Sequence, residues 1–320
     1  MKRSSTDVRA GRIYQAVSPL LWFIDYPFRL VYMGNKPSQN LPAIFILAPP
    51  RSGSTLLYQV LTEAFSNVHL TNIANLFFST PMLGFMLSDR LCKNHRTKYE
   101  SLNGFVQGIC GEAEGMKFWK YWMGQGLDYY KARLKPKRLK KLQELLSQRY
   151  SPEEKVWISG YIGHVFCIDL LSQHWPNAVF IHLYRDLVSN AYSLYKCSPN
   201  RWFSLNPGGI QNVARNRYEE IARQIIRIHS IILDYYGKDM FSLSYQELCD
   251  SPQQIIKKIN VFALDNDILL REKHSVPKIF KKNKVEPGFD GHTQRLYQYL
   301  KEETLKYKGH KKLFFERLIV

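Results

Sequence analysis

The chain has 320 residues, of which 45% are hydrophobic and 14% aromatic, and this composition excludes an intrinsically disordered protein. Its formal net charge of +18 predicts a surface that attracts anions, such as a nucleotide, an acidic polysaccharide, nucleic acid or a membrane face. The sequence has no zinc-ligand spacing, RNA-binding aromatic motif or basic heptads, so we expect no specific nucleic-acid partner.

The N-terminal segment is expected to lie apart from the main domain. Residues 1–12 are polar and basic and predict a loose tail, and residues 13–33 predict a helix packed on the domain. The uninterrupted apolar stretch 19–24 is too short to span a bilayer, which needs about 20 residues, so the alternative is a peripheral membrane contact. We predict a tail and packing helix over 1–40, and one α/β domain over 41–320 with a helical insertion at about 75–150.

The stretch 44–61, IFILAPPRSGSTLLYQVL, predicts a buried strand, a tight loop and a helix N-terminus. Such a loop presents backbone N–H groups and the positive end of a helix to an anion, and Arg51 adds a full charge. Hydroxyls come from Ser52, Ser54 and Thr55. A nucleoside triphosphatase is disfavoured because Ser54 stands where its loop needs lysine. The guest is expected to be phosphate or sulfate; an ordinary strand-loop-helix corner is the alternative.

The middle of the chain offers candidate acid-base groups. A short strand is expected at 68–70 and a helical segment at 77–91. In the segment 111–122, GEAEGMKFWKYW, Glu112 and Glu114 lie next to tryptophans, which suits a general base with a raised pKa. The alternative is a solvated edge of an amphipathic helix. The basic run 130–155 predicts an exposed helix, either solvated or facing an acidic partner.

A second anion-binding pattern follows a predicted βαβ unit. Strands are expected at 155–162 and 178–183, with a helix at 163–174 between them, which implies a parallel sheet covered on both faces. Arg185 follows the second strand, at the end where open α/β sheets bind ligands. Ser193 lies eight residues later, two turns along the predicted helix 187–196. The alternative for Arg185 is a structural ion pair with Asp186.

These two patterns resemble the sulfotransferases that use 3′-phosphoadenosine 5′-phosphosulfate (PAPS). The run APPRSGSTLL is similar to their 5′-phosphosulfate loop, and FIHLYRDLVSNAYSLYK is similar to their 3′-phosphate motif. The resemblance covers 43–264, and weakly the basic loop 281–284. It implies an α/β three-layer sandwich with a central parallel sheet, a P-loop-like nucleotide-binding core and a helical cap. It also implies PAPS as donor, adenosine 3′,5′-bisphosphate as product, no metal, and donor-binding residues Arg51, Ser52, Gly53, Ser54, Thr55, Arg185, Ser193 and Tyr245.

The chain departs from the family pattern at two places. Relatives commonly carry Lys-x-Pro-x-x-His before the βαβ helix; here His164 survives, but Ser159 and Gly160 stand where the lysine is expected. Either Lys117 or Arg51 then carries that charge, or catalysis is impaired. Relatives also often place a glutamate about 20 residues after the loop arginine, where this chain has no carboxylate. The general base is then Glu114 or Glu112, with His69 or His164 behind them.

The sequence predicts transfer of a sulfuryl group to a hydroxyl or amine, with a saccharide or lipid-linked acceptor favoured over a small phenol. A kinase-like P-loop enzyme and a non-catalytic basic protein of the same fold are the alternatives.

The cysteines concern the location of the protein. They are odd in number and widely scattered, which argues against a disulfide framework and for a reducing compartment, so the predicted location is cytoplasmic. They are Cys92, Cys110, Cys167, Cys197 and Cys249.

Overall fold

The computed structural model describes residues 25–27, 30, 39–102, 104–124, 134–197, 214, 216–237, 239–282, 284–286 and 288–319. The predicted tail and most of the predicted packing helix lie outside these residues, and the domain boundaries stay a prediction. Among the described helices, none has both the length and the apolar character needed to cross a membrane.

A parallel sheet forms the centre of the described fold. Its strands are β1 (Ala43–Leu47), β2 (Asn67–His69), β3 (Val156–Ser159), β4 (Ala178–Tyr184) and β5 (Met240–Ser244), in the order β2-β3-β1-β4-β5. Every neighbouring pair is parallel. Because β1 and β4 are parallel neighbours in the middle of the sheet, the loops that follow them begin side by side at the carboxyl ends of the strands. This confirms the predicted α/β class.

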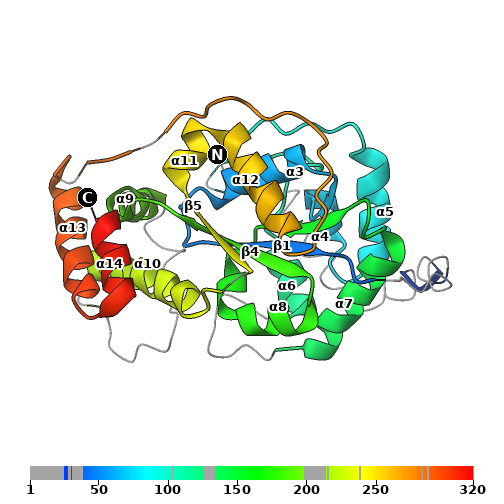
Figure 1. Ribbon diagram of the computed structural model, residues 1–320, viewed down its shortest axis with the longest axis horizontal. Coiled ribbons are helices and arrows are strands. Elements are labelled where there is room, and N and C mark those ends of the chain that lie inside the picture. The colour runs from blue at the N-terminus through cyan, green and yellow to red at the C-terminus, as the bar shows by residue number, and fades with distance from the viewer. Residues whose placement is uncertain are drawn as a thin grey trace, which may run out of the picture.

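The central strand β1 is buried on both faces and packs into two separate clusters. Ala43, Phe45 and Leu47 pack with α6 (Met116–Trp122), α7 (Pro136–Arg149) and α8 (Ile168–His174). Ile44 and Ile46 pack on the opposite face with α3 (Ser54–Ala64), α11 (Tyr245–Asp250) and α12 (Pro252–Leu264). The alternation follows from the two-residue period of a strand. The result is the predicted three-layer sandwich (Figure 1).

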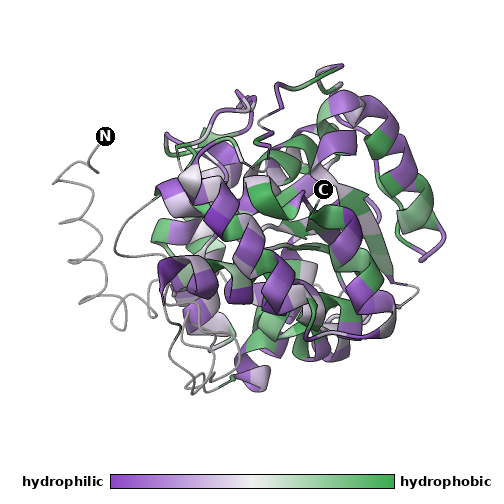
Figure 2. Cartoon of the chain, turned by 90° about the vertical axis from the view of Figure 1, so that its left-hand side faces the viewer, coloured by the Kyte–Doolittle hydropathy of each residue, from purple (hydrophilic) through white to green (hydrophobic). Residues whose placement is uncertain are grey.

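A third hydrophobic cluster lies on the left-hand side of the molecule in Figure 1. It joins α9 (Leu187–Cys197), α10 (Arg217–Asp234), α13 (Gly291–Thr304) and α14 (Gly309–Leu318). Figure 2 views the molecule from this side and shows hydrophobic and hydrophilic residues on the same helices, as expected for amphipathic helices on a core. Neither α13 nor α14 was predicted. This cluster fixes α9, which carries Ser193.

The predicted strand 155–162 and helix 163–174 are shorter than expected. The strand ends at Ser159, and a Cβ added at the next residue, Gly160, would lie 3.0 Å from the ring of Tyr58. A 3-10 helix, Ile162–Phe166, then precedes α8. This tight turn places His164 in the core, with its ring edge against Trp119 at 4.5 Å between centroids. The predictions for β4 and α9 are confirmed within one residue at each end.

In the chain, four helices lie between β2 and β3: α4 (Asn72–Leu76), α5 (Pro81–Leu91), α6 and α7. The end of α5 is joined to the segment before Glu112 by a disulfide between Cys92 and Cys110. The prediction that the cysteines form no disulfide is therefore wrong. Sequence spacing does not show that the two segments meet beside β2. Cys167, Cys197 and Cys249 are not part of a disulfide.

Candidate active site

The loop after β1 turns sharply into α3. Arg51 and Gly53 both have positive φ, at 68° and 96°. Two features favour glycine at position 53. Its backbone is left-handed, and an added Cβ would overlap the ring of Tyr245. No side chain caps the start of α3. The N–H groups of its first turn and the positive end of the helix dipole therefore remain available to an anion.

The loop is also held from within and from α9. The hydroxyl of Ser52 donates to the carbonyl of Pro49 at 2.8 Å, and the side-chain amide of Asn190 donates to the carbonyl of Pro50 at 2.8 Å. Ser52 is fully buried. Its hydroxyl therefore shapes the loop, whereas Ser54 and Thr55 face the cavity described below.

The two sequence motifs converge on each other. Arg185, directly after β4, donates through Nη1 to the carbonyl of Arg51 at 3.3 Å. Arg51 in turn donates through Nε to the hydroxyl of Ser193 at 3.3 Å. The guanidinium of Arg185 lies over the ring of Tyr245, 4.8 Å from its centre. Residues more than 130 positions apart in the chain thus form one cationic site.

This site lines a cavity of about 750 Å³, here called the main cavity. Of the eight residues predicted to bind the donor, all except Ser52 line it. Its volume lies in the range typical of small-molecule sites. Lys281, from the predicted late loop, lines it as well.

Among the predicted bases, Glu114 is the one that lines the main cavity. The segment before α6 pairs with the chain after β2, since Ala113 N–H donates to the carbonyl of Leu70 at 2.7 Å. Glu114 is partly buried. Burial raises its pKa from 4.5 to about 7, and the charge of Arg51 acts in the opposite direction. At neutral pH this carboxylate can therefore both accept and release a proton.

Glu112 lies two residues earlier in the chain. It is buried and accepts from the side chains of Gln59 and Thr62, each at 3.5 Å. It does not line the main cavity but a second one, here called the edge pocket. Eight charged or titratable residues line that pocket: Glu63, His69, Asp89, Lys93, His95, Glu112, Lys155 and Lys273.

The two histidines also lie outside the main cavity. His164 is fully buried, Nε2 lies 2.8 Å from the hydroxyl of Ser159, and burial lowers its pKa to about 3. His69 lies in the edge pocket with Nδ1 2.7 Å from the side-chain oxygen of Asn67. Burial and nearby positive charges lower its pKa to about 3. Both rings are therefore neutral at physiological pH.

Ser159 and Gly160, which stand where the family lysine is expected, belong to the core of the domain. Ser159 is buried and bonded to His164, and Gly160 packs against Tyr58. Lys117 is exposed and does not line the main cavity, whereas Arg51 does.

Sequence reasoning missed Tyr99 and Phe280, which line the main cavity and lie 5.1 Å apart between ring centres. Single aromatic residues in loops carry no motif, so no pattern could have identified them. In the described ranges, no group of three or more His, Cys, Asp or Glu is arranged to hold a metal ion.

A model of the sulfotransferase family matches residues 42–263, a range that includes both motifs and more than half of the chain. No curated protein matches the sequence. Among solved structures, the sulfotransferase STF1 from Mycobacterium tuberculosis H37Rv is 12% identical with a TM-score of 0.48, covering 98% of this chain and 84% of that one. The sulfotransferase domain of the Synechococcus PCC 7002 olefin synthase is 15% identical with a TM-score of 0.41, covering 89% and 90%. By the sequence match over both motifs, this chain belongs to the sulfotransferase family.

Proposed function

We propose that the protein transfers a sulfuryl group from PAPS to a hydroxyl or amine of an acceptor. One observation carries the proposal: Arg51 and Arg185, from two separate motifs, line one cavity together with the uncapped start of α3. Two guanidinium groups and a helix N-terminus suit a ligand with several phosphate or sulfate oxygens. Membership of the sulfotransferase family supports the reaction class.

The residues present fit such a donor. Arg51, Ser54, Thr55 and the backbone at Gly53 would hold the 5′-phosphosulfate, and Arg185 with Ser193 would hold the 3′-phosphate. Arg51 and Ser193 are hydrogen-bonded to each other, and we expect the donor to replace this bond with stronger charge-assisted ones. The absence of a side chain at Gly53 allows the loop to pass close to Tyr245.

The chemistry asked of the protein is positioning, charge stabilisation and proton removal. Like phosphoryl transfer, sulfuryl transfer needs no covalent catalysis if the acceptor and donor are aligned and the charge on the transferred oxygens is stabilised. Glu114 is the proposed base, because it lines the main cavity and has a pKa near neutrality. Arg51 is proposed to supply the charge of the missing lysine.

The proposed acceptor is a saccharide or lipid-linked saccharide. The Tyr99 and Phe280 rings give the main cavity an aromatic surface, and Gln59 gives it a polar side chain. Sugar rings pack their apolar faces on aromatics and use polar groups for their hydroxyls. A panel of glycan, glycolipid and phenol acceptors with labelled PAPS tests this choice by measuring which one is sulfated.

The proposed location changes from the predicted cytoplasm to an oxidising compartment. The cytoplasmic prediction depended on the odd number and wide scatter of the cysteines, and the disulfide between Cys92 and Cys110 weakens that argument. Disulfides persist mainly in oxidising environments. Thiol labelling of the native protein taken from cells tests this, since Cys92 and Cys110 should resist labelling until a reductant is added. Peripheral membrane contact stays a prediction.

Thermal-shift titration tests the donor assignment. We expect strong stabilisation by adenosine 3′,5′-bisphosphate and little by ATP with magnesium, because a ligand that binds the folded state raises its melting temperature. The reverse result would favour the kinase-like alternative. Binding of the bisphosphate without turnover of labelled PAPS on any acceptor would favour the non-catalytic alternative.

A further inference from the structure

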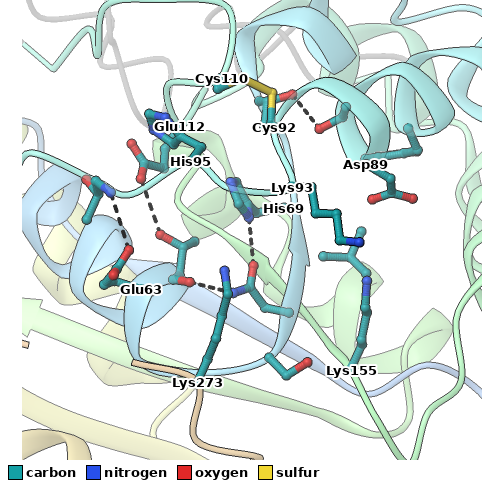
Figure 3. Close-up of a pocket in the computed structure, with 18 residues that line it drawn as sticks. Glu63, His69, Asp89, Cys92, Lys93, His95, Cys110, Glu112, Lys155 and Lys273 are labelled. Atoms are coloured by element: carbon teal, nitrogen blue, oxygen red, sulfur yellow. Dashed lines mark hydrogen bonds between the residues drawn. A yellow bond between two sulfur atoms is a disulfide. The ribbon is translucent and has the colours of Figure 1, made fainter. Parts of the chain in front are cut away.

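The edge pocket lies beside β2, which is the edge strand of the sheet. Its volume is about 460 Å³. The end of α3, the last turns of α5 and the segment joined by the Cys92–Cys110 disulfide surround it, as Figure 3 shows. None of the functions discussed so far uses this pocket.

The carboxylates at the edge pocket are largely satisfied. Glu63 is buried and forms an ion pair with Arg96. Asp89 accepts from Arg149 at 2.7 Å and from the hydroxyl of Tyr150 at 2.9 Å. Glu112 differs from these two carboxylates because both of its hydrogen-bond donors, the side chains of Gln59 and Thr62, are neutral.

The lysines at the same pocket are not matched by carboxylates. Among the described residues, Lys93, Lys155 and Lys273 have no acidic group within 4 Å of their ammonium groups, although ion pairs form elsewhere on the surface. Lys155 contacts the ring of Tyr150 at 4.9 Å. In Figure 3, Lys93 and Lys155 extend toward each other across the pocket, and Lys273 enters from another segment. Three positive charges therefore face one unneutralised carboxylate.

The state of His69 agrees with this charge balance. Burial is the largest cause of the lowered pKa of His69, and the charges of Lys273, His95 and Lys155 are the next largest. These groups therefore act on the same point in the pocket, and they make it positive. An anion entering the pocket would relieve the repulsion among them.

The edge pocket shares a wall with the main cavity. Gln59 lines the main cavity and donates to Glu112, which lines the edge pocket. Glu112 and Glu114 lie two residues apart in the chain, which limits the distance between their Cα atoms to about 7 Å. A ligand bound in the edge pocket is therefore a near neighbour of the proposed base.

We propose that the edge pocket is a second anion-binding site, whose occupant carries a sulfate, phosphate or carboxylate group held by Lys93, Lys155 and Lys273. Two sources share this chemistry: a free inorganic oxyanion, and an acidic group on the acceptor. The second source rests on the proposed sulfotransferase function, and the first does not.

Inorganic sulfate is the probe, titrated against sodium chloride of equal ionic strength by calorimetry. The main cavity is first saturated with adenosine 3′,5′-bisphosphate, so that sulfate cannot bind at Arg51. If the bisphosphate does not bind, the proposed function has failed, and the titration is made instead on the Arg51→Ala, Arg185→Ala double variant. The test of the edge pocket is thereby independent of the donor assignment.

The variant to compare is the triple Lys93→Ala, Lys155→Ala, Lys273→Ala. The matched control is Lys137→Ala, Lys140→Ala, Lys258→Ala, which removes the same charge from exposed helix surfaces. Since a partly exposed charge pair changes affinity about two- to fivefold, we expect the first triple variant to bind sulfate about tenfold more weakly or worse. The control should bind as the unmodified protein does. Equal loss in both triples, or no sulfate binding beyond that of chloride, would overturn the proposal.

A sulfated disaccharide then separates the two sources. If the acceptor supplies the anion, the disaccharide should displace sulfate and bind about tenfold more tightly, because its sugar hydroxyls make a second set of contacts. If the occupant is a free ion, the disaccharide should bind no better than sulfate. Either result supports the site if the triple lysine variant binds both ligands more weakly than the unmodified protein does. Disaccharide affinity that is unchanged in the triple variant would overturn the proposal.

Discussion

The main cavity and the edge pocket both attract anions, but they hold their positive charges differently. In the main cavity, Arg51 and Arg185 are fixed by hydrogen bonds and by the ring of Tyr245, directly after two central strands. In the edge pocket, lysines extend from separate segments and have no carboxylate partner in the part of the chain that the structure describes.

This difference follows from the two side chains. A guanidinium is a planar fork that matches phosphate and sulfate oxygens in one orientation, whereas an ammonium is a point charge on a flexible stem. The comparison indicates that the main cavity is preorganised for a single ligand geometry. The edge pocket is suited to the charge of a ligand more than to its shape.

The largest expected effect is that of Glu114→Gln. If Glu114 is the base, the turnover rate with PAPS should fall about 10²- to 10⁴-fold, because general-base catalysis typically contributes that much. Affinity for adenosine 3′,5′-bisphosphate should hardly change. In the unmodified protein, activity should rise with pH and level off above about 7, as Glu114 loses its proton. A Glu114→Gln enzyme with the same pH profile would remove Glu114 from the mechanism.

Stability provides an independent reading of the same carboxyl group. Because its pKa is raised from 4.5 to about 7, the folded state binds the proton more tightly than the unfolded chain does. The free energy of unfolding should therefore fall as pH rises through this window, and Glu114→Gln should reduce the fall. Urea unfolding at several pH values measures it.

Arg185→Ala should have the second largest effect. Removing one partner of a buried charge-assisted contact costs about 2–5 kcal/mol, so affinity for adenosine 3′,5′-bisphosphate should fall at least about 30-fold. Calorimetry measures the affinity, and Arg90→Ala, which removes an exposed arginine from α5, is the control. Retained affinity would mean that Arg185 is a structural residue, and the contrast between the two cavities would then lose its strongest support.

The double variant Cys92→Ser, Cys110→Ser tests the wall of the edge pocket. The bond closes a loop of 18 residues, and removing it should lower the free energy of unfolding by about 2–4 kcal/mol. Urea unfolding with and without reductant measures the loss. Cys197→Ser, which replaces a cysteine outside the disulfide, is the control and should cost less stability. Equal stability of the double variant and the unmodified protein would show that the bond does not support this region.

Gly53→Ala should have the smallest effect of this series, a loss of about 1–3 kcal/mol in the free energy of unfolding. It combines backbone strain at φ 96° with overlap on Tyr245. Gly108→Ala is a matched control, because Gly108 has φ 88° but an added Cβ meets nothing within 4 Å. Similar losses in both variants would show that strain alone, and not the approach of Tyr245, makes glycine necessary in the loop.

The sequence predicted the main cavity better than the edge pocket, and the reason is physical. Arg51 and Arg185 follow apolar strands, and a parallel sheet brings such strand ends together whatever lies between them. Lys93, Lys155 and Lys273 belong to no such pattern, and only the folded chain shows that they meet. The same holds for Cys92 and Cys110, and for Tyr99 and Phe280. The sequence also did not show that His164, which lies in a 3-10 helix, would be buried in the core.

The hydrogen bond from Arg185 to the carbonyl of Arg51 has a consequence for inhibitor discovery. It links the two arginines that line the main cavity. A fragment that engages Arg185 also steadies the peptide that presents Arg51, so a second fragment meets a loop that is already ordered. Linked fragments should therefore bind this protein more tightly than their separate affinities suggest.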